Sequence, residues 1–436
     1  MKGPSALRVF GILRGLVPAI VFFPGGVAAT PLQDQLDAAE PGATLRVKAG
    51  VFAGPLTMDK SLTLLGDPGA EIHGDGTGSV VRIVADDVRV SGFRITGSGI
   101  DLSKDDAAVH VTGHGVTIEN NRIDDSLHGI YLKKVQGARI LHNTIRGKTT
   151  LPPPEKPAAG IIVADSVENC AVGLNVNVRG NGIHLWNCEK NLIEGNDIAD
   201  TRDGMYFSFT RNTRVRDNTV WRVRYGLHYM YSDDNIFERN RFSDNAAGAA
   251  MMYSKNLVVR GNRFTANRGS RAYGVLLNSV DTTRIENNVF LGNSVGMYLE
   301  NSNSNVFTGN AVERNYIGIR LTASSGENAF SRNRFSGNMH PVELAGQSET
   351  NRWEIGGVGN RWQGAEVIDL TGDGVGDVPH RESDALGGLR RPFPLVGLLS
   401  GSPGLAVLQF ARSHAPLPDQ RAIKDPAPLT LGFSLP

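Results

Sequence analysis

The sequence predicts an all-β protein, a right-handed parallel β-helix in which each coil of the solenoid takes about 22 residues. The first observation behind this prediction is a glycine, followed by an apolar residue, that recurs mostly at steps of 22 residues. A fixed period of this size is typical of repeat proteins, in which one repeat cannot bury its own apolar face and stacking supplies the core. The recurrent glycines are Gly129, Gly160, Gly182, Gly204, Gly226, Gly248, Gly274, Gly296 and Gly318.

The second observation is an asparagine that recurs with the same period between the expected strands. Asparagine tolerates the left-handed backbone of a sharp turn, and its amide bonds to neighbouring backbone, so we expect these side chains to stack as a hydrogen-bonded ladder. Segments such as 61–64 and 80–84 supply the third observation, because they alternate apolar and polar residues as short strands do. The asparagines are Asn196, Asn218, Asn240, Asn262, Asn288 and Asn310.

Residues 1–29 have the composition of a secretory signal peptide. Three basic residues, Lys2, Arg8 and Arg14, come before a short apolar run, and small residues follow it as a cleavage site. The run is too short and too interrupted by glycine and proline to span a membrane, and no later stretch is long enough. Cleavage leaves 42 basic and 44 acidic residues without a basic stripe, so nucleic acid is not an expected partner. We expect an exported protein with no membrane span.

The rest of the chain divides into four parts. The first is an N-terminal cap with a short amphipathic helix, in which Thr30 is the expected N-cap and Pro31 the first helical residue. Such a helix covers the open end of a solenoid. The predicted parts are the cap at 30–43, the β-helix at 44–365, an Asp/Gly-rich loop region at 366–390 and an irregular C-terminal docking tail at 391–436.

Two steps of the repeat are longer than the others. The step before Gly160 holds nine extra residues, including the Pro-rich stretch 151–157, and the step before Gly274 holds four extra residues near 268–271. Insertions in solenoids form loops, often on the working face.

The chain has only two cysteines, Cys170 and Cys188. Export permits a disulfide between them. They occupy different positions within their repeats, and the sequence leaves both a disulfide and two free thiols open.

Successive side chains of a strand point to opposite faces, so each coil divides by parity. The residue directly after each recurrent glycine is apolar in every coil, which predicts a core stripe that includes Met205 and Met297. The second and fourth residues after the glycine then face outward, yet in the central coils they carry imidazole, aromatic and thioether side chains. These outward residues are His184, Trp186, Tyr206, His228, Met230 and Met252.

Two interpretations of this outward face stay open. Met230 and Met252 lie one coil apart, and His228 lies two residues from Met230 on the same face; imidazole with thioethers is the ligand set expected for Cu(I). The alternative is an apolar patch that binds a partner protein, with methionine as its adaptable filler. Candidate residues of that patch are His184, Trp186 and Tyr206.

A second metal is suggested by the loop region. Asp369, Thr371, Asp373 and Asp377, with Gly374 at the bend, place oxygen ligands at alternate positions of a tight loop, as calcium-binding loops do. The usual distal glutamate is missing. The alternative is a hydrogen-bonded Asp/Gly turn.

An enzyme that acts on acidic polysaccharides, or a carbohydrate-binding β-helix, is the competing functional class. A polysaccharide lyase or epimerase needs a carboxylate cluster or a paired acid and base on one face. The relevant acids do not stack in one outward column, so a non-catalytic protein is favoured. They are Asp124, Asp125, Asp200, Asp203 and Asp233.

Several segments resemble the NosD family. The central ones are YGLHYMYS at 225–232, AAGAAMMYS at 246–254 and NRGSRAYG at 267–274; the closing ones are GNRW at 359–362 and DGVGDVPH at 373–380. The similarity covers nearly all of residues 30–395, and the block around Gly226 is its most specific part.

The resemblance implies a periplasmic, non-catalytic factor that assembles the copper–sulfide centre of nitrous-oxide reductase. It further implies an ABC transporter, made of a membrane permease and a cytoplasmic ATPase, and a copper chaperone that delivers Cu(I). On this reading the protein handles Cu(I) transiently near His228, Met230 and Met252, or holds the client enzyme. The resemblance supplies no catalytic residue.

Overall fold

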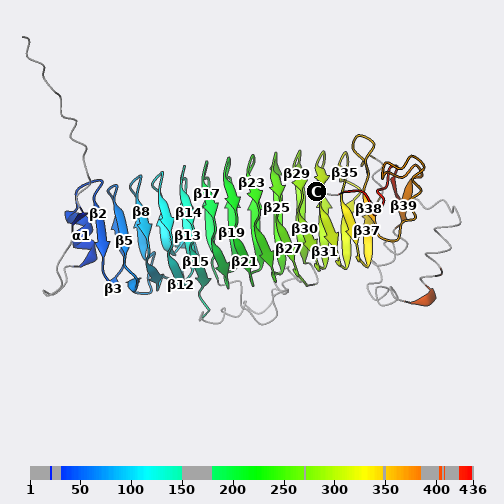
Figure 1. The fold of residues 1–436 in the computed structure, drawn as a ribbon. Helices are drawn as coiled ribbons and strands as arrows, with labels where there is room; N and C mark the ends of the chain where they lie inside the picture. Colours follow the sequence, from blue (N-terminus) through cyan, green and yellow to red (C-terminus); the bar gives the residue numbers. More distant parts are fainter. Residues whose placement is uncertain are drawn as a thin grey trace, which may run out of the picture.

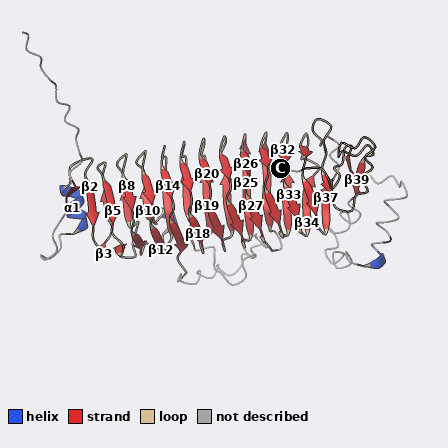
Figure 2. Cartoon of the chain, viewed as in Figure 1, coloured by secondary structure: helices blue, strands red, loops and turns tan. Residues whose placement is uncertain are grey.

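The computed structural model describes residues 20–21, 31–149, 179–269, 272–346, 350–383, 402–404, 407 and 422–434. Over these residues the chain winds as a right-handed parallel β-helix with a short helix at its N-terminal end (Figure 1). Strands form nearly all of the regular structure (Figure 2). The predicted fold class is confirmed. No helix within the described residues is long and apolar enough to cross a membrane.

Each full coil contributes one strand to each of three parallel sheets, which we call the glycine sheet, the second sheet and the third sheet in chain order. The glycine sheet has 12 strands: β4 (Leu56–Met58), β7 (Val81–Ile83), β10 (Ala107–Val111), β13 (His128–Lys133), β16 (Ile183–Trp186), β19 (Asp203–Ser208), β22 (Tyr225–Met230), β25 (Ala247–Lys255), β28 (Tyr273–Asp281), β31 (Val295–Glu300), β34 (Ile317–Thr322) and β37 (His340–Ala345).

The other two sheets have 13 strands each. The second sheet contains β1 (Ile20–Val21), β2 (Thr44–Val47), β5 (Thr63–Gly66), β8 (Arg89–Ser91), β11 (Thr117–Glu119), β14 (Arg139–Leu141), β17 (Leu192–Glu194), β20 (Arg214–Arg216), β23 (Ile236–Glu238), β26 (Val258–Arg260), β29 (Arg284–Glu286), β32 (Val306–Thr308) and β35 (Ala329–Ser331). The third sheet contains β3 (Gly50–Ala53), β6 (Ala70–His73), β9 (Arg94–Thr96), β12 (Arg122–Ser126), β15 (Thr144–Gly147), β18 (Asp197–Ala199), β21 (Thr219–Trp221), β24 (Arg241–Ser243), β27 (Arg263–Thr265), β30 (Val289–Leu291), β33 (Ala311–Glu313), β36 (Arg334–Ser336) and β38 (Arg361–Trp362). Outside these sheets lie α1 (Leu32–Ala38), the 3-10 helix η1 (Leu102–Lys104), β39 (His380–Ser383) and β40 (Ala422–Asp425).

The solenoid differs from the predicted repeat at one coil. Strand β13 pairs directly with β16, which places Ile130 opposite Ile183, and β14 and β15 likewise pair directly with β17 and β18. The coil expected at Gly160 is therefore absent from the described stack, because the coils on either side of the insertion already pair along all three sheets. Residues 150–178, which include Cys170, lie outside the described residues; Cys188 is a buried free thiol.

Helix α1 closes the N-terminal end of the solenoid. It begins one residue later than predicted, because Pro31 has an extended backbone and serves as the N-cap. Leu32 and Leu36 are buried in the hydrophobic core. Gln33 pairs with the edge strand β4: its amide nitrogen donates to the Thr57 carbonyl at 3.1 Å, and the Thr57 N–H donates to its amide oxygen at 2.8 Å. The helix thereby satisfies backbone groups that an open sheet edge leaves unpaired.

The recurrent glycines are required by close approach between coils and not by a left-handed backbone. A Cβ added to Gly204 would lie 2.7 Å from the carbonyl oxygen of Gly226 in the next coil. Gly226 meets the carbonyl of Gly248 in the same way. Neither Gly204 nor Gly226 has a positive φ. Only a residue without a side chain lets the strands of the glycine sheet start in register here.

The predicted asparagine ladder is present between the second and third sheets. At Asn240, the side-chain oxygen accepts hydrogen bonds from the backbone N–H and the amide nitrogen of Asn218, at 3.1 and 2.9 Å. Its own amide nitrogen donates to the Val215 carbonyl at 2.9 Å and to the Asn262 side chain at 3.0 Å. The buried members are Asn121, Asn143, Asn196, Asn218, Asn240, Asn262, Asn288, Asn310, Asn333 and Asn360.

We expected the ladder asparagine to adopt the left-handed conformation of this turn. In the structure the residue before the asparagine adopts it instead. Asp217, Arg239 and Gly261 have φ values of 58°, 52° and 64°, and the asparagines that follow them have negative φ. The asparagines are therefore required for their amides, which satisfy buried backbone groups in the next coil.

The ladder ends on a carboxylate from the far end of the chain. Asp425 in β40 is fully buried, and its Oδ2 accepts hydrogen bonds from the Asn360 N–H at 2.8 Å and from the Trp362 indole at 2.8 Å. Strand β40 pairs antiparallel with β39. Part of the predicted docking tail thus returns to cover the C-terminal end of the solenoid.

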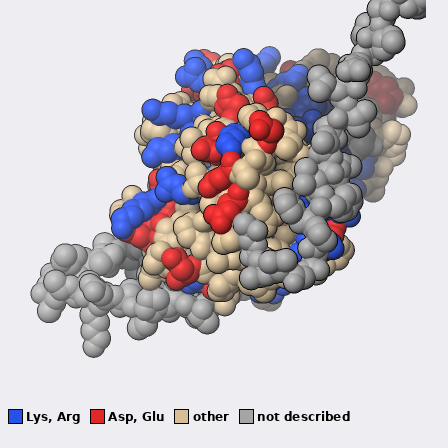
Figure 3. Space-filling model, turned by 90° about the vertical axis from the view of Figure 1, so that its left-hand side faces the viewer, with Lys and Arg blue, Asp and Glu red and all other residues tan. Residues whose placement is uncertain are grey.

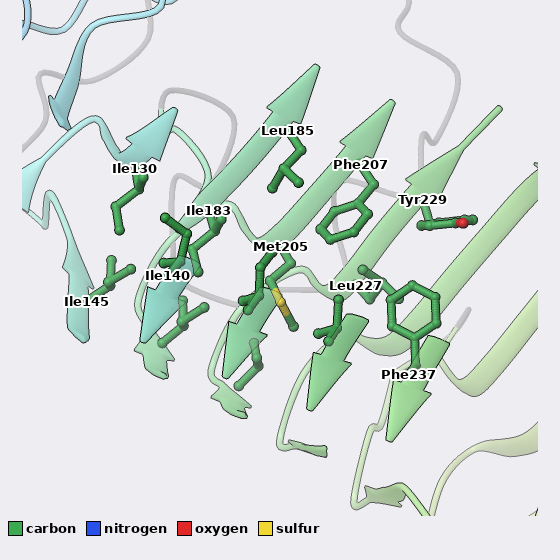
Figure 4. Packing of buried hydrophobic residues seen from close by; sticks show 14 of the residues in the cluster. Ile130, Ile140, Ile145, Ile183, Leu185, Met205, Phe207, Leu227, Tyr229 and Phe237 are labelled. Atoms are coloured by element: carbon green, nitrogen blue, oxygen red, sulfur yellow. The ribbon is translucent and has the colours of Figure 1, made fainter. Parts of the chain in front are cut away.

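The interior is a stack of like side chains, seen in Figure 4 around β16, β19 and β22. Met205 and Met297 are fully buried, as the parity argument predicted. Phe242, Phe264 and Phe290 stack with ring centroids 5.2 and 5.0 Å apart. Because coils repeat at the strand spacing of about 4.8 Å, a residue type that packs well in one coil packs equally well in the next.

Replacing one rung of the ladder should destabilise the whole stack. Asn240→Ala leaves buried donors and acceptors of two coils without partners, and we expect the free energy of unfolding to fall by about 3 kcal/mol in urea denaturation. Asn301→Gly is the matched control, since Asn301 is exposed and left-handed, with φ of 49°. A loss no greater than that of the control would show that the ladder contributes little.

Candidate functional site

The candidate residues lie on the outer face of the glycine sheet, over strands β16, β19, β22 and β25. In β22, Leu227 and Tyr229 are fully buried, whereas His228 and Met230 are half-buried on the outer side. The strand register places Met230 directly opposite Met252 of β25. The division by parity is therefore as predicted, and the two methionines are neighbours across one coil.

A continuous row of imidazole and phenol rings runs along this face. The His184 ring centroid lies 4.5 Å from that of Tyr131 and 4.5 Å from that of Tyr206, and Tyr206 lies 4.8 Å from His228. His110 extends the row beyond Tyr131 at 5.1 Å. All four contacts are edge-to-face, a favourable geometry for aromatic pairs. The row joins the predicted partner patch to the predicted copper ligands as one surface.

The sequence columns did not predict His110 of the ring row, nor two further residues of this surface. His128 lies 5.5 Å from His184, and Asp203 contacts His228. Both precede a recurrent glycine, a position outside the columns that we considered. The signal was present in the sequence, because in these coils that position is polar or aromatic: His128, Asn181, Asp203 and Tyr225.

Two histidines of this surface are neutral, the buried His128 and the half-buried His184. Burial lowers the pKa of His184 to about 3 and that of His128 to about 4. Asn181 bonds to both, since its backbone N–H donates to His128 Nδ1 at 2.9 Å and its side-chain amide lies 3.3 Å from His184 Nδ1. Uncharged imidazole is the form that binds metals.

His228 is held by a buried ion pair. Asp203 is fully buried and accepts two hydrogen bonds from the Arg224 guanidinium, at 2.8 and 2.7 Å, and one from His228 Nδ1 at 2.9 Å. Burial by itself raises the pKa of the Asp203 carboxyl, but the bonds from His228 and Arg224 outweigh it and lower the pKa to about 2. The carboxylate therefore keeps the proton on Nδ1 and leaves the lone pair of Nε2 for a ligand. Metal-binding histidines are commonly oriented in this way.

The methionines supply soft donors beside this histidine. The Tyr206 hydroxyl lies 3.9 Å from the Met230 sulfur, which ties Met230 to the ring row. No group of three or more His, Cys, Asp and Glu side chains within the described residues is placed to hold a metal ion. Thioethers are ligands that Cu(I) accepts. His228, Met230 and Met252 fit it by donor chemistry.

The predicted calcium loop is a hydrogen-bonded turn. Both oxygens of Asp369 accept loop N–H bonds, at 2.6 Å from Gly372 and 2.8 Å from Gly374, and Thr371 lies 3.4 Å from the same carboxylate. The bond from Gly374 lowers the pKa of Asp369. Asp373 and Asp377 likewise accept backbone N–H bonds, at 2.9 and 2.7 Å. These carboxylates are already used within the loop, so the arrangement gives no support to calcium.

Comparison with known proteins identifies the family of this chain. A family model described as "Periplasmic copper-binding protein (NosD)" matches residues 162–366, and one described as "Right handed beta helix region" matches residues 72–208. A curated relative from Pseudomonas aeruginosa, named "Probable ABC transporter binding protein NosD", is 33% identical over 399 residues, which covers 87% of this chain and 86% of the relative. This chain belongs to the NosD family.

A second relative with the same name, from Stutzerimonas stutzeri, is 31% identical and covers 98% of this chain and 96% of its own. Among solved structures, the surface adhesin PfbA of Streptococcus pneumoniae matches with a TM-score of 0.50 at 14% identity, covering 72% of this chain and 87% of that one. At that identity the likeness shows only the shared fold. The NosD family model spans all six outward residues from His184 to Met252.

The neutral histidines predict an acid-sensitive fold. The pKa of His184 is about 3 in the folded protein and about 6.5 in the unfolded chain, so its stabilisation is complete above pH 6.5 and is lost as pH falls toward 3. We expect the melting temperature to fall between pH 7 and pH 5, and His184→Phe, which keeps a ring in the row, to reduce that fall.

His142→Asn is the matched control, because His142 is exposed and its left-handed backbone suits asparagine. Its melting temperature should follow the wild-type pH profile. An unchanged profile in His184→Phe as well would contradict the assignment of a buried neutral imidazole.

Proposed function

We propose that this protein is a periplasmic accessory factor for assembly of the copper–sulfide centre of nitrous-oxide reductase. It acts with an ABC transporter, formed by a membrane permease and an ATPase, and receives Cu(I) from a copper chaperone. Copper is cargo in this scheme and passes over the outer face of the glycine sheet. The family description as a periplasmic copper-binding protein and the names of the relatives support this proposal.

The observation that carries the copper role is the orientation of His228. Asp203 fixes the proton on Nδ1, and Met230 and Met252 come from the same outer face in adjacent coils. A site of one imidazole and two thioethers, half exposed, binds Cu(I) and lets a partner protein approach it. Such a site suits transfer better than permanent storage.

The client enzyme contacts the same face. His184, Trp186 and Tyr206 adjoin the copper ligands and form a half-buried aromatic surface, the composition expected of a protein interface. The N-terminal end of the solenoid carries acidic and basic side chains side by side (Figure 3), which agrees with a protein partner in preference to nucleic acid. The transporter contacts an end of the solenoid.

The copper site is tested by a Cu(I) competition titration. Met230→Ala/Met252→Ala removes both thioethers, and we expect affinity to fall by at least about tenfold, since each tenfold step corresponds to about 1.4 kcal/mol. Met297→Leu is the control, because Met297 is fully buried in the core, two coils beyond Met252. Equal affinities in the double variant and the wild type would rule out the methionine pair.

The assembly role is tested in a host that makes nitrous-oxide reductase but lacks this protein. The reductase should lack the optical spectrum of its copper–sulfide centre there, and supplying the wild-type gene should restore it. Full assembly without this protein would overturn the proposed function. Turnover of polyuronates by the purified protein would point to the competing polysaccharide-active class.

A further inference from the structure

Three exposed aromatic rings form a stack at the corner between the glycine sheet and the second sheet. Phe209 and Tyr231 lie 5.3 Å apart at an angle of 10°, and Tyr231 and Tyr253 lie 5.0 Å apart at 11°. Their exposed fractions are 51, 45 and 47%. Stacked rings cover each other's faces, so only the outermost rings keep a free face. The free face of Phe209 points toward the preceding coil.

The backbone conformation at these three positions is unfavourable for aromatic residues. All three are left-handed, with φ of 53°, 49° and 52°, a conformation that is rare for bulky side chains. The same turn carries asparagine in other coils, at Asn187 and Asn301, with φ of 53° and 49°. Unfavourable backbone conformations persist mainly where function needs them. Packing within the solenoid does not require these rings.

The stack stops at Asn187, where a hollow opens. This hollow of about 550 Å³ is bounded by Phe209 on one side and Lys134 on the other, with Asn187 and Trp186 between them. Lys134 occupies the same turn position as the three rings, in the coil on the far side of Asn187, with φ of 59°. Along this column a cation, Lys134, is followed by Asn187, which carries no ring, and then by the ring face of Phe209. We call the space outside Asn187 the empty rung.

The empty rung has the dimensions of one aromatic ring. Coils repeat at about 4.8 Å, so a ring above Asn187 lies one repeat from Phe209 and one repeat from Lys134. The first separation matches the stacking distances already present in the column, and the second matches a cation–π contact. Lys134 now lies 5.7 Å from the Trp186 ring centroid, so it already contacts an aromatic face at this corner.

The charged residues that line the hollow favour an inserted ring with an acidic group beside it. Its lining includes the bases Lys134 and Arg211 and one acid, Glu189, which is itself 3.3 Å from Lys190. Within the described residues no carboxylate lies within 4.0 Å of the Lys134 or Arg211 side-chain nitrogens. A ligand with a carboxylate beside its ring complements both bases.

We propose that this hollow is a docking socket for a partner protein that inserts an aromatic side chain flanked by an acidic residue. The inserted ring becomes the fourth rung of the Phe209, Tyr231 and Tyr253 stack, between Phe209 and Lys134, and the carboxylate pairs with Arg211. This extends the proposed function, on which it rests only for the existence of a partner protein. It places the contact at a corner of the solenoid two coils from Met230, since Trp186 pairs with Ser208 and Ser208 pairs with Met230.

The test uses the whole protein labelled with 5-fluorotryptophan and two synthetic peptides. The probe is acetyl-Glu-Tyr-Glu-amide, and acetyl-Glu-Ala-Glu-amide is the comparison of equal charge. The chain has four tryptophans, so a Trp186→Phe variant assigns the fluorine resonance of Trp186. We expect a saturable shift of that resonance with the tyrosine peptide, with a dissociation constant of about 1 mM or below, and no such shift with the alanine peptide.

A matched pair of variants tests the position. Asn187→Phe fills the rung from within and should abolish the shift, whereas Asn301→Phe adds a ring to an equivalent exposed left-handed turn and should leave it unchanged. Wild-type binding by Asn187→Phe, equal binding of the two peptides, or no saturable shift would each overturn the socket. If reductase assembly still depends on the protein in that event, the proposed function stands and only the socket is wrong. If the peptide binds but reductase assembly does not depend on the protein, the socket stands and the proposed function is wrong.

Discussion

The vertical register between coils is the constraint on which the rest of this structure depends. Backbone hydrogen bonds of three parallel sheets hold each residue above its counterpart one coil away, and a slip of one residue would turn every core side chain to the outside. The buried asparagine ladder pins this register at one corner, because each amide bonds to both the backbone and the side chain of the adjacent coil. The recurrent glycine at the start of the strands of the glycine sheet in the central coils permits the close approach that the register demands.

The register between coils places residues of one sequence column side by side as a row, and such rows form the candidate functional surface. Isolated histidines and tyrosines become a continuous ring row from His110 to His228, and two methionines become neighbours. The same effect places the exposed rings of Phe209, Tyr231 and Tyr253 in one stack. The sheet itself holds the candidate metal ligands and the exposed aromatic rings one coil apart, so no loop is needed to position them.

Electrostatics on this face are organised by one buried carboxylate. Asp203 is shared between Arg224 and His228, so it neutralises a buried cation and also fixes the proton of an imidazole. His184 and His128 are instead neutral, because removal of their rings from water disfavours the charged forms. The row therefore carries little charge, which suits both a soft cation and an aromatic protein surface.

The fold class, the coil length, the asparagine ladder and the alternation of buried and exposed residues after the recurrent glycines could all be predicted from the sequence. These follow from periodicity, because a column repeated every 22 residues must stack on itself. The sequence also placed His228, Met230 and Met252 on one face. The three-dimensional structure was needed to show which columns meet: Asp203 contacts His228 of the next coil, and the left-handed residue precedes the ladder asparagine. Likewise, pairing between coils decided that the stretch at Gly160 is absent from the described stack, and loop geometry decided that the Asp369 carboxylate is taken up by N–H groups. Periodicity reports what repeats along a column, whereas contacts between columns depend on how the backbone bends.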